Sequence, residues 1–121
     1  MYTYPFEKLE VWHLAKKLAI DIYKLTKVFP AEEKYGMTSQ MRRAAVSVSS
    51  NIAEGTARST VKDRANFYQM AYSSLMELLN QVIIASELSW MKTETYTNLR
   101  TDIEHVSNKL NALRKSELKK V

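Results

Sequence analysis

Hydrophobic residues recur along this chain with helical spacing, which at 100° per residue places them on one face of a helix. In the first segment they run from Val11 to Phe29, and the charged residues lie mainly outside the apolar arc. Three later segments repeat this spacing, and the last has a seam at Leu99, Ile103, Val106, Leu110 and Leu113. The pattern therefore predicts four helices, at about residues 7–28, 39–57, 61–88 and 93–117.

Residues with turn or capping chemistry separate these segments. Pro5 precedes the first helix, and Pro30 follows it. A hydroxyl can accept a hydrogen bond from a free N–H at the start of a helix. We expect such caps at Thr38 or Ser39, at Ser59 or Thr60, and at Thr93. Because the connections are short, we predict an all-α fold: an antiparallel, up-and-down four-helix bundle in a single domain, residues 1–121.

Two of the predicted helices have more apolar surface than a monomeric bundle needs. The second contains ten uncharged residues at positions 44–53, mostly Ala, Ser and Val. The third carries two adjacent seams, which are Phe67, Ala71, Leu75, Leu78 and Val82, and Tyr68, Tyr72, Leu79 and Ile83. Together they make an apolar arc of roughly 180°, where a surface helix needs about 100°. This width predicts self-association.

Composition narrows the class of protein. The 121 residues include only 2 Gly and 2 Pro, too few for the many turns of a small β-sandwich or barrel. Cys is absent, which excludes disulfides, cysteine nucleophiles and thiolate metal sites. The first residues lack a signal-peptide pattern, and no apolar run approaches the roughly 20 residues that cross a bilayer. We therefore expect a cytoplasmic protein that does not contact membranes.

A polar stripe crosses the second predicted helix beside its apolar arc. Its members, at spacings of 4, 4, 3 and 4, are Arg43, Ser47, Asn51, Glu54 and Arg58. They fall within about 80° of one another. One interpretation is a hydrogen-bond network between helices or subunits, with Arg43 and Glu54 paired to other helices. The alternatives are a groove for nucleic acid or another ligand, and a catalytic site.

A metal site is a second possibility for a four-helix bundle. Glu10 and His13 have Glu-x-x-His spacing, Asp102 and His105 resemble it, and Glu54 and Glu77 would complete a set of ligands. Both histidines, however, are predicted to point away from the apolar faces. The sequence also lacks a phosphate-binding Gly-rich loop, G-x-S-x-G and H-E-x-x-H. We therefore expect no metal, no cofactor and no enzymatic activity.

The net charge of +5, from 18 Lys+Arg against 13 Asp+Glu, favours an anionic partner. Basic residues gather around the second helix and its junction with the third. The candidate nucleic-acid-binding residues are Arg42, Arg43, Arg58, Lys62 and Arg64. A second cluster lies near the C-terminus. Tyr68 and Tyr72 have the chemistry to stack on bases, although their spacing fits core packing better. The alternative for both clusters is a solvated surface.

Several motifs resemble a known family. They are LEVW at residues 9–12, KVFP at 27–30, SQMRRAAVSV at 39–48, NIAEG at 51–55 and YSSLMEL at 72–78. Over residues 6–88 the chain is similar to the bacterial four-helix bundles named for the 23S rRNA intervening-sequence proteins. The positions that match the family include Gly55 and most of the stripe. Thr56 and Ala57 depart from it, because the family more often has an aromatic residue and Gly before the Arg.

The resemblance implies a homopentamer of four-helix bundles. Some members are encoded within sequences inserted into 23S rRNA genes. Relatives that accompany diversity-generating reverse transcriptases bind nucleic acid and the transcriptase. We therefore expect a non-enzymatic, basic oligomer that contacts structured RNA, with 23S rRNA as the candidate, mainly through phosphates. The alternative is a protein–protein adaptor with no nucleic-acid role, in which the stripe is purely structural.

Overall fold

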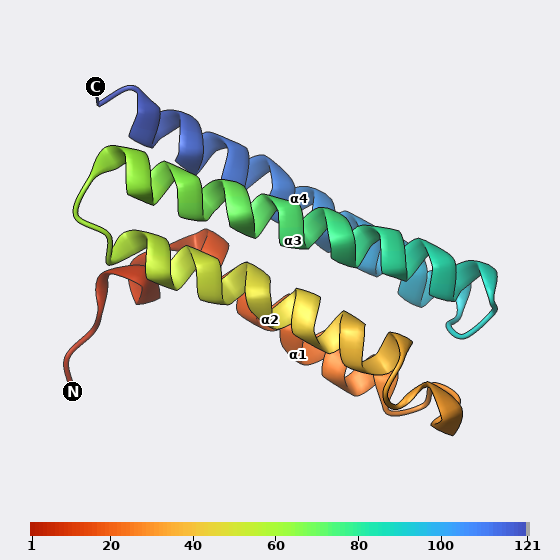
Figure 1. Cartoon of the computed structure of the whole chain (residues 1–121). Helices are drawn as coiled ribbons and strands as arrows, with labels where there is room; N and C mark the ends of the chain where they lie inside the picture. The colour runs from red at the N-terminus through yellow and green to blue at the C-terminus, as the bar shows by residue number, and fades with distance from the viewer. Residues whose placement is uncertain (121) are drawn as a thin grey trace.

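The computed structural model describes residues 1–120, and regular structure there is entirely helical. The long helices are α1 (Glu10–Thr26), α2 (Met37–Thr56), α3 (Val61–Glu87) and α4 (Thr93–Leu118). Two short 3₁₀ helices, η1 (Pro5–Lys8) and η2 (Ala31–Glu33), precede α1 and α2. In Figure 1 each long helix lies alongside the one before it, and α4 also packs on α1. The predictions of an all-α fold and of four helices are confirmed.

The first helix is shorter than predicted. Residues 7–8 belong to η1, and Leu9 is extended between η1 and α1. At the other end, Pro30 has no N–H to donate to the carbonyl oxygen of Thr26. That oxygen instead accepts from the N–H of Phe29 at 3.2 Å, and α1 ends at Thr26.

The capping predictions had mixed outcomes. Thr60 caps α3 as predicted, since its Oγ1 accepts from the N–H of Asp63 at 3.1 Å. At α2 the prediction is wrong. The carboxylate of Glu33 accepts from the N–H of Met37 at 3.1 Å, so the helix begins before Thr38 and needs no hydroxyl cap. Thr93 is the first residue of α4 and not its cap.

Each long helix contributes to one apolar core. The largest fully buried side chains are Leu18, Ile22, Met41, Val48, Ile52, Leu75, Leu78, Val82, Ile103, Val106 and Leu110. They include most of the predicted seam of α4, whose last member, Leu113, is half-buried. Within residues 1–120 no helix is long and apolar enough to cross a membrane.

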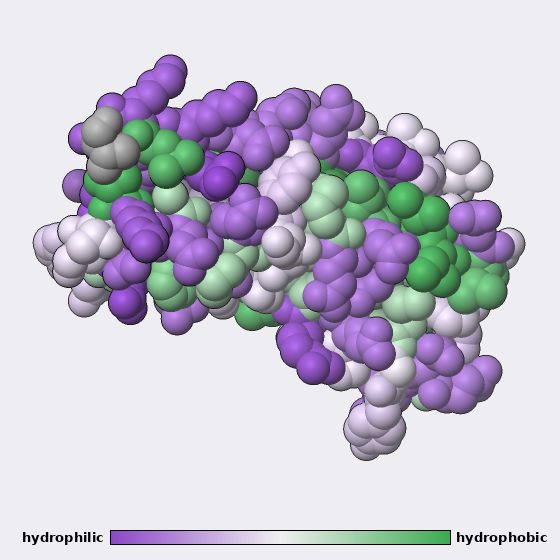
Figure 2. Space-filling view, turned by 45° about the horizontal axis from the view of Figure 1, so that its top comes forward, coloured by the Kyte–Doolittle hydropathy of each residue, from purple (hydrophilic) through white to green (hydrophobic). Residues whose placement is uncertain are grey.

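The wide apolar arc of α3 is largely covered within a single chain. Tyr68 is buried, and Tyr72, Leu79 and Ile83 are half-buried. Ile84 and Leu88, near the end of the helix, remain exposed. Figure 2 shows hydrophobic residues gathered at the end of the molecule where α3 joins α4. Neighbouring helices of the same chain therefore cover much of the arc, and self-association stays a prediction.

Candidate nucleic-acid interface

The middle of the polar stripe connects α2 to α3. Ser47 and Ser74 share a hydrogen bond between their hydroxyls at 2.9 Å. Asn51 is buried, and its side-chain amide donates to the carbonyl oxygen of Ser47 at 2.9 Å and to the Ser47 hydroxyl at 3.1 Å. These bonds satisfy polar groups where two helices meet, so Ser47 and Asn51 belong to a network between helices of one chain.

The charged members of the stripe behave differently. Arg43 and Glu54 are exposed, and neither forms an ion pair or a side-chain hydrogen bond with any residue from Met1 to Lys120. Within the described part of one chain no other helix supplies such a partner, and pairing of Arg43 and Glu54 across a subunit contact stays a prediction. Both lie at the solvent edge of the α2 arc, where a charge is stable in water without a protein partner. Arg43 lines a hollow of about 310 Å³ between α2 and α3.

At the junction of α2 and α3 two of the three candidate basic residues are tied to the fold. Arg58 lies 3.6 Å from the carboxylate of Asp63, and its guanidinium lies 5.3 Å from the ring centroid of Phe67. Arg64 forms an ion pair with Glu117 of α4 and donates to the carbonyl oxygen of Arg58 at 3.0 Å. Lys62 is exposed and has no ion pair within the described part of the chain. Two of the three positive charges at this junction are therefore compensated by carboxylates of the same chain.

The carboxylate at the centre of this junction is buried. Glu117 accepts from Arg64 and from the ammonium of Lys120, the latter at 2.6 Å. Burial by itself raises the pKa of Glu117, but the hydrogen bonds from Lys120 and Arg64 outweigh burial and hold the pKa below its ordinary value. The charged form of Glu117 is therefore part of the folded structure.

Tyr68 and Gly55 fix how closely α2 approaches α3. A Cβ on Gly55 would lie 2.6 Å from Cε1 of Tyr68, closer than packed atoms allow, and 3.1 Å from Cβ of Phe67, which is a tight contact. The ring of Tyr68 is only 3% exposed, so it is not available to stack on a base. Burial, and then the charge of Glu117, raise the pKa of the Tyr68 hydroxyl. The interpretation of Tyr68 as a core residue is confirmed.

Arg42 joins the first half of α2 to the end of α1. Its Nε donates to Oγ1 of Thr26 at 2.8 Å, and Nη2 donates to the carbonyl oxygen of Tyr23 at 3.4 Å. The guanidinium lies 4.7 Å from the ring centroid of Tyr23. None of these partners carries a negative charge. The positive charge of Arg42 therefore remains uncompensated although its position is fixed.

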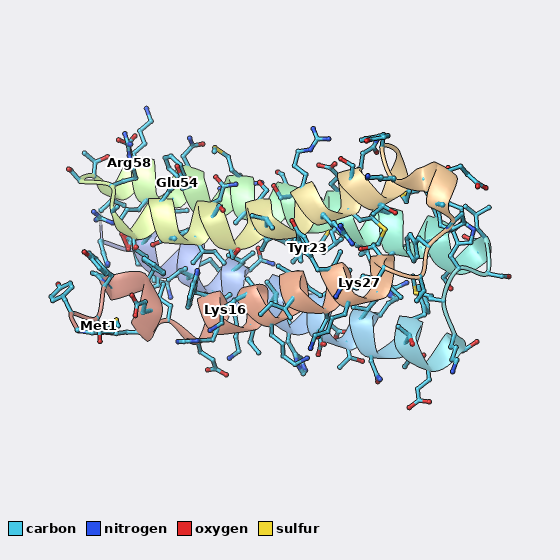
Figure 3. All side chains as sticks on the ribbon, turned by 90° about the horizontal axis from the view of Figure 1, so that it is seen from below. Met1, Lys16, Tyr23, Lys27, Glu54 and Arg58 are labelled. Atoms are coloured by element: carbon cyan, nitrogen blue, oxygen red, sulfur yellow. The ribbon has the colours of Figure 1, made fainter. Side chains whose placement is uncertain are left out.

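Two hollows, of about 610 and 470 Å³, lie on the outer side of α1 and α2 and share Tyr23 and Val46. We call them together the basic groove. Its basic residues are Lys16, Lys24, Lys27, Lys34, Arg42 and Arg43. No Asp or Glu is found among the described residues that line it. Figure 3 shows Lys16, Tyr23 and Lys27 along α1, with Arg58 at the far end of α2.

The structure thus separates the five candidate residues. Arg42 and Arg43 lie in the basic groove, whereas Arg58, Lys62 and Arg64 lie at the opposite end of α2. Sequence reasoning missed the contribution of α1, although a signal was present. Lys16, Lys24 and Lys27 fall within about 80° of one another on a helical projection. Spacing along α1 alone does not show that these lysines face the same groove as Arg43 of α2.

The residues considered for a metal lie on the surface. His13 is exposed and its ring Nε2 donates to the carbonyl oxygen of Glu7 at 2.6 Å. Glu10 pairs with Lys109 at 3.2 Å. The outward direction predicted for both histidines is confirmed, since His105 is also exposed. Among residues 1–120 no group of three or more His, Asp or Glu side chains is placed to hold a metal ion.

Comparisons with known proteins agree with this architecture. A crystal structure of a protein of unknown function from the S23 ribosomal protein family of Bacteroides thetaiotaomicron matches with a TM-score of 0.80 and 22% sequence identity. The match covers 87% of this chain and 95% of the other. No curated protein sequence matches the chain. The pattern of the 23S rRNA-intervening sequence proteins matches residues 7–112. The chain therefore belongs to the 23S rRNA-intervening sequence protein family.

Proposed function

We propose that this protein is a non-enzymatic, cytoplasmic scaffold that binds structured RNA, with 23S rRNA as the candidate, through contacts between the basic groove and phosphates. The family name links its members to a 23S rRNA intervening sequence. We assign no reaction, because the sequence offers neither a nucleophile with its base nor a phosphate-binding loop.

The observation that carries the proposal is the absence of carboxylates among the described residues of the basic groove. Six cations without an internal counter-charge attract a polyanion, and each phosphate they neutralise releases a counterion. Lys24, Lys27 and Arg43 have no ion pair within the part of the chain that the structure describes. Their charge is therefore available to an external partner.

We further propose that the up-and-down bundle assembles into a homopentamer, as the family resemblance implies. The exposed side chains of Ile84 and Leu88 support a contact at the end of α3. Assembly would repeat the basic groove around the oligomer and strengthen its field. Light scattering of the purified protein tests this state. A mass of five chains is expected, and a monomer at micromolar concentration would contradict it.

RNA affinity across a salt series tests the groove. The variant K24Q/K27Q/R43Q removes three unpaired charges and should reduce the slope of log K against log salt by about 2 to 3. The matched control K8Q/K92Q/R100Q makes the same charge change at exposed residues outside both the basic groove and the C-terminal cluster. Its slope should stay closer to that of the unaltered protein.

Two results would contradict the proposal. If both triple variants lose the same affinity, binding reflects net charge and not the basic groove. If the unaltered protein binds an rRNA fragment no better than another protein of equal charge, even at low salt, the RNA role fails. A protein–protein adaptor would then be the function to pursue.

A further inference from the structure

We propose that the basic groove recognises an unpaired segment of structured RNA, with a base stacked on Tyr35. This inference rests on the proposed RNA-binding function and names the form of RNA that the groove prefers. The groove also exposes apolar and aromatic side chains, which phosphates alone would not contact.

The floor of the groove is apolar and open to water. Ile20, Tyr23 and Val46 are 46%, 43% and 40% exposed, and all three line it. A duplex presents its phosphates and sugars outward and keeps its base faces stacked inside, so it would cover the cations and leave this floor wet. An unpaired strand carries both kinds of surface. Its phosphates can contact the cations of the rim, and its base faces can pack on the apolar floor.

Tyr35 is the aromatic ring best placed for stacking. It is 87% exposed at the mouth of the groove, and the ammonium of Lys34 lies 5.3 Å from its ring centroid. Tyr23 lies deeper and is held by the guanidinium of Arg42. Arg43 lines the same hollow as both tyrosines. A stacking ring beside unpaired cations is the arrangement by which proteins hold single strands without reading their sequence.

The dimensions of the groove also suit a strand. Its larger hollow has a volume of about 610 Å³ and is open to solvent, so a strand could enter and leave it at either side. The rim runs along α1 from Lys16 to Lys27. These residues are eleven positions apart, which corresponds to a helical rise of about 16 Å. Because the cations are spread over this length, the groove is suited to follow a backbone and not to hold one isolated phosphate.

The experiment compares two probes on the full-length protein, a fluorescent 12-nucleotide oligouridine and an RNA duplex of the same length. We expect Y35A to weaken oligouridine binding by about 5- to 150-fold, the range for losing one stacked base. Duplex binding should change less than twofold, and Y35F, which keeps the ring, should restore oligouridine binding. The matched control is Y2A, which removes a tyrosine that is 70% exposed outside the groove.

Each failure has its own signature. If Y35A leaves oligouridine binding unchanged while K24Q/K27Q/R43Q weakens it, the groove binds phosphates and the stacking inference is overturned. If Y35F loses as much affinity as Y35A, the hydroxyl is the contact and stacking is again overturned. If poly-glutamate displaces oligouridine at equal charge concentration, the groove favours an acidic protein segment. If neither RNA binds at low salt, the proposed function itself fails.

Discussion

The two ends of α2 carry similar basic residues and use them in opposite ways. At the junction with α3, Arg58 faces Asp63, and Arg64 faces the buried carboxylate of Glu117. Near the start of α2, Arg42 is held only by neutral oxygens, and Arg43 has no carboxylate partner within residues 1–120. Positive charge is therefore available for binding only where the fold leaves it without a counter-charge.

Distance keeps these two regions independent. Arg43 and Arg58 are separated by fifteen residues of helical rise, about 22 Å. At physiological ionic strength the Debye length is about 8 Å, so charges at one end have little effect on the electrostatic potential at the other. The comparison predicts that substitutions at the junction change stability and that substitutions in the basic groove change binding.

The largest effect is expected for Arg64→Met. It leaves the carboxylate of Glu117 buried with only Lys120 to compensate it, and breaking such a pair costs about 3 kcal/mol of unfolding free energy. Urea unfolding at fixed protein concentration measures the loss. The control Lys62→Met removes an unpaired charge nearby and should change stability by less than about 0.5 kcal/mol. A stable Arg64→Met protein with weakened RNA binding would reverse the assignment of this junction.

Gly55→Ala should destabilise the protein by about 1–2 kcal/mol. The added methyl group meets the buried ring of Tyr68, and the cost of overpacking exceeds the gain of about 1 kcal/mol in helix propensity. Because the clash requires that ring, the same substitution in a Tyr68→Leu background should cost less. A double-mutant cycle measures this coupling. Equal costs in both backgrounds would show that the close approach to Tyr68 is not the cause.

Arg43→Gln should weaken RNA binding while leaving stability nearly unchanged, the reverse of what is expected for Arg64→Met. The loss of one phosphate contact should lower RNA affinity several-fold, about 1 kcal/mol. Stability should change by less than about 0.5 kcal/mol, because the side chain is exposed. Unfolding and RNA titration of the same preparation measure both quantities. A marked loss of stability would show that Arg43 takes part in the stripe network or in a subunit contact.

The smallest effect is a dependence of stability on pH. Because the pKa of folded Glu117 lies below its ordinary value of 4.5, its contribution is fully present above that value. It is lost as the pH falls through the lower pKa of the folded state. Acid titration of unfolding should therefore show a steeper decline for the unaltered protein than for Arg64→Met. Parallel curves would argue against the Arg64–Glu117 pair as the cause.

The core and the caps differ in how far the sequence predicted them. The seam of Leu99, Ile103, Val106 and Leu110 is buried as its spacing indicated. The Thr60 cap was also predictable, because its partner Asp63 lies three residues away. The cap of α2 was not, since the carboxylate of Glu33 replaces the expected hydroxyl from a separate 3₁₀ turn. A cap supplied by the residue directly before its helix was thus easier to predict than one supplied by a side chain from a separate 3₁₀ turn.

By itself, the sequence determined the four helices, the side of each that is buried, and the contiguity of the polar stripe. These follow from the helical period, which is a local property of the chain. Only the tertiary structure decided which charges are neutralised, because Arg64 and Glu117 are 53 positions apart in sequence. It also decided that the lysines of α1 and Arg43 line one groove. The relative rotation of packed helices brings such residues together, and no spacing within a single helix encodes that rotation.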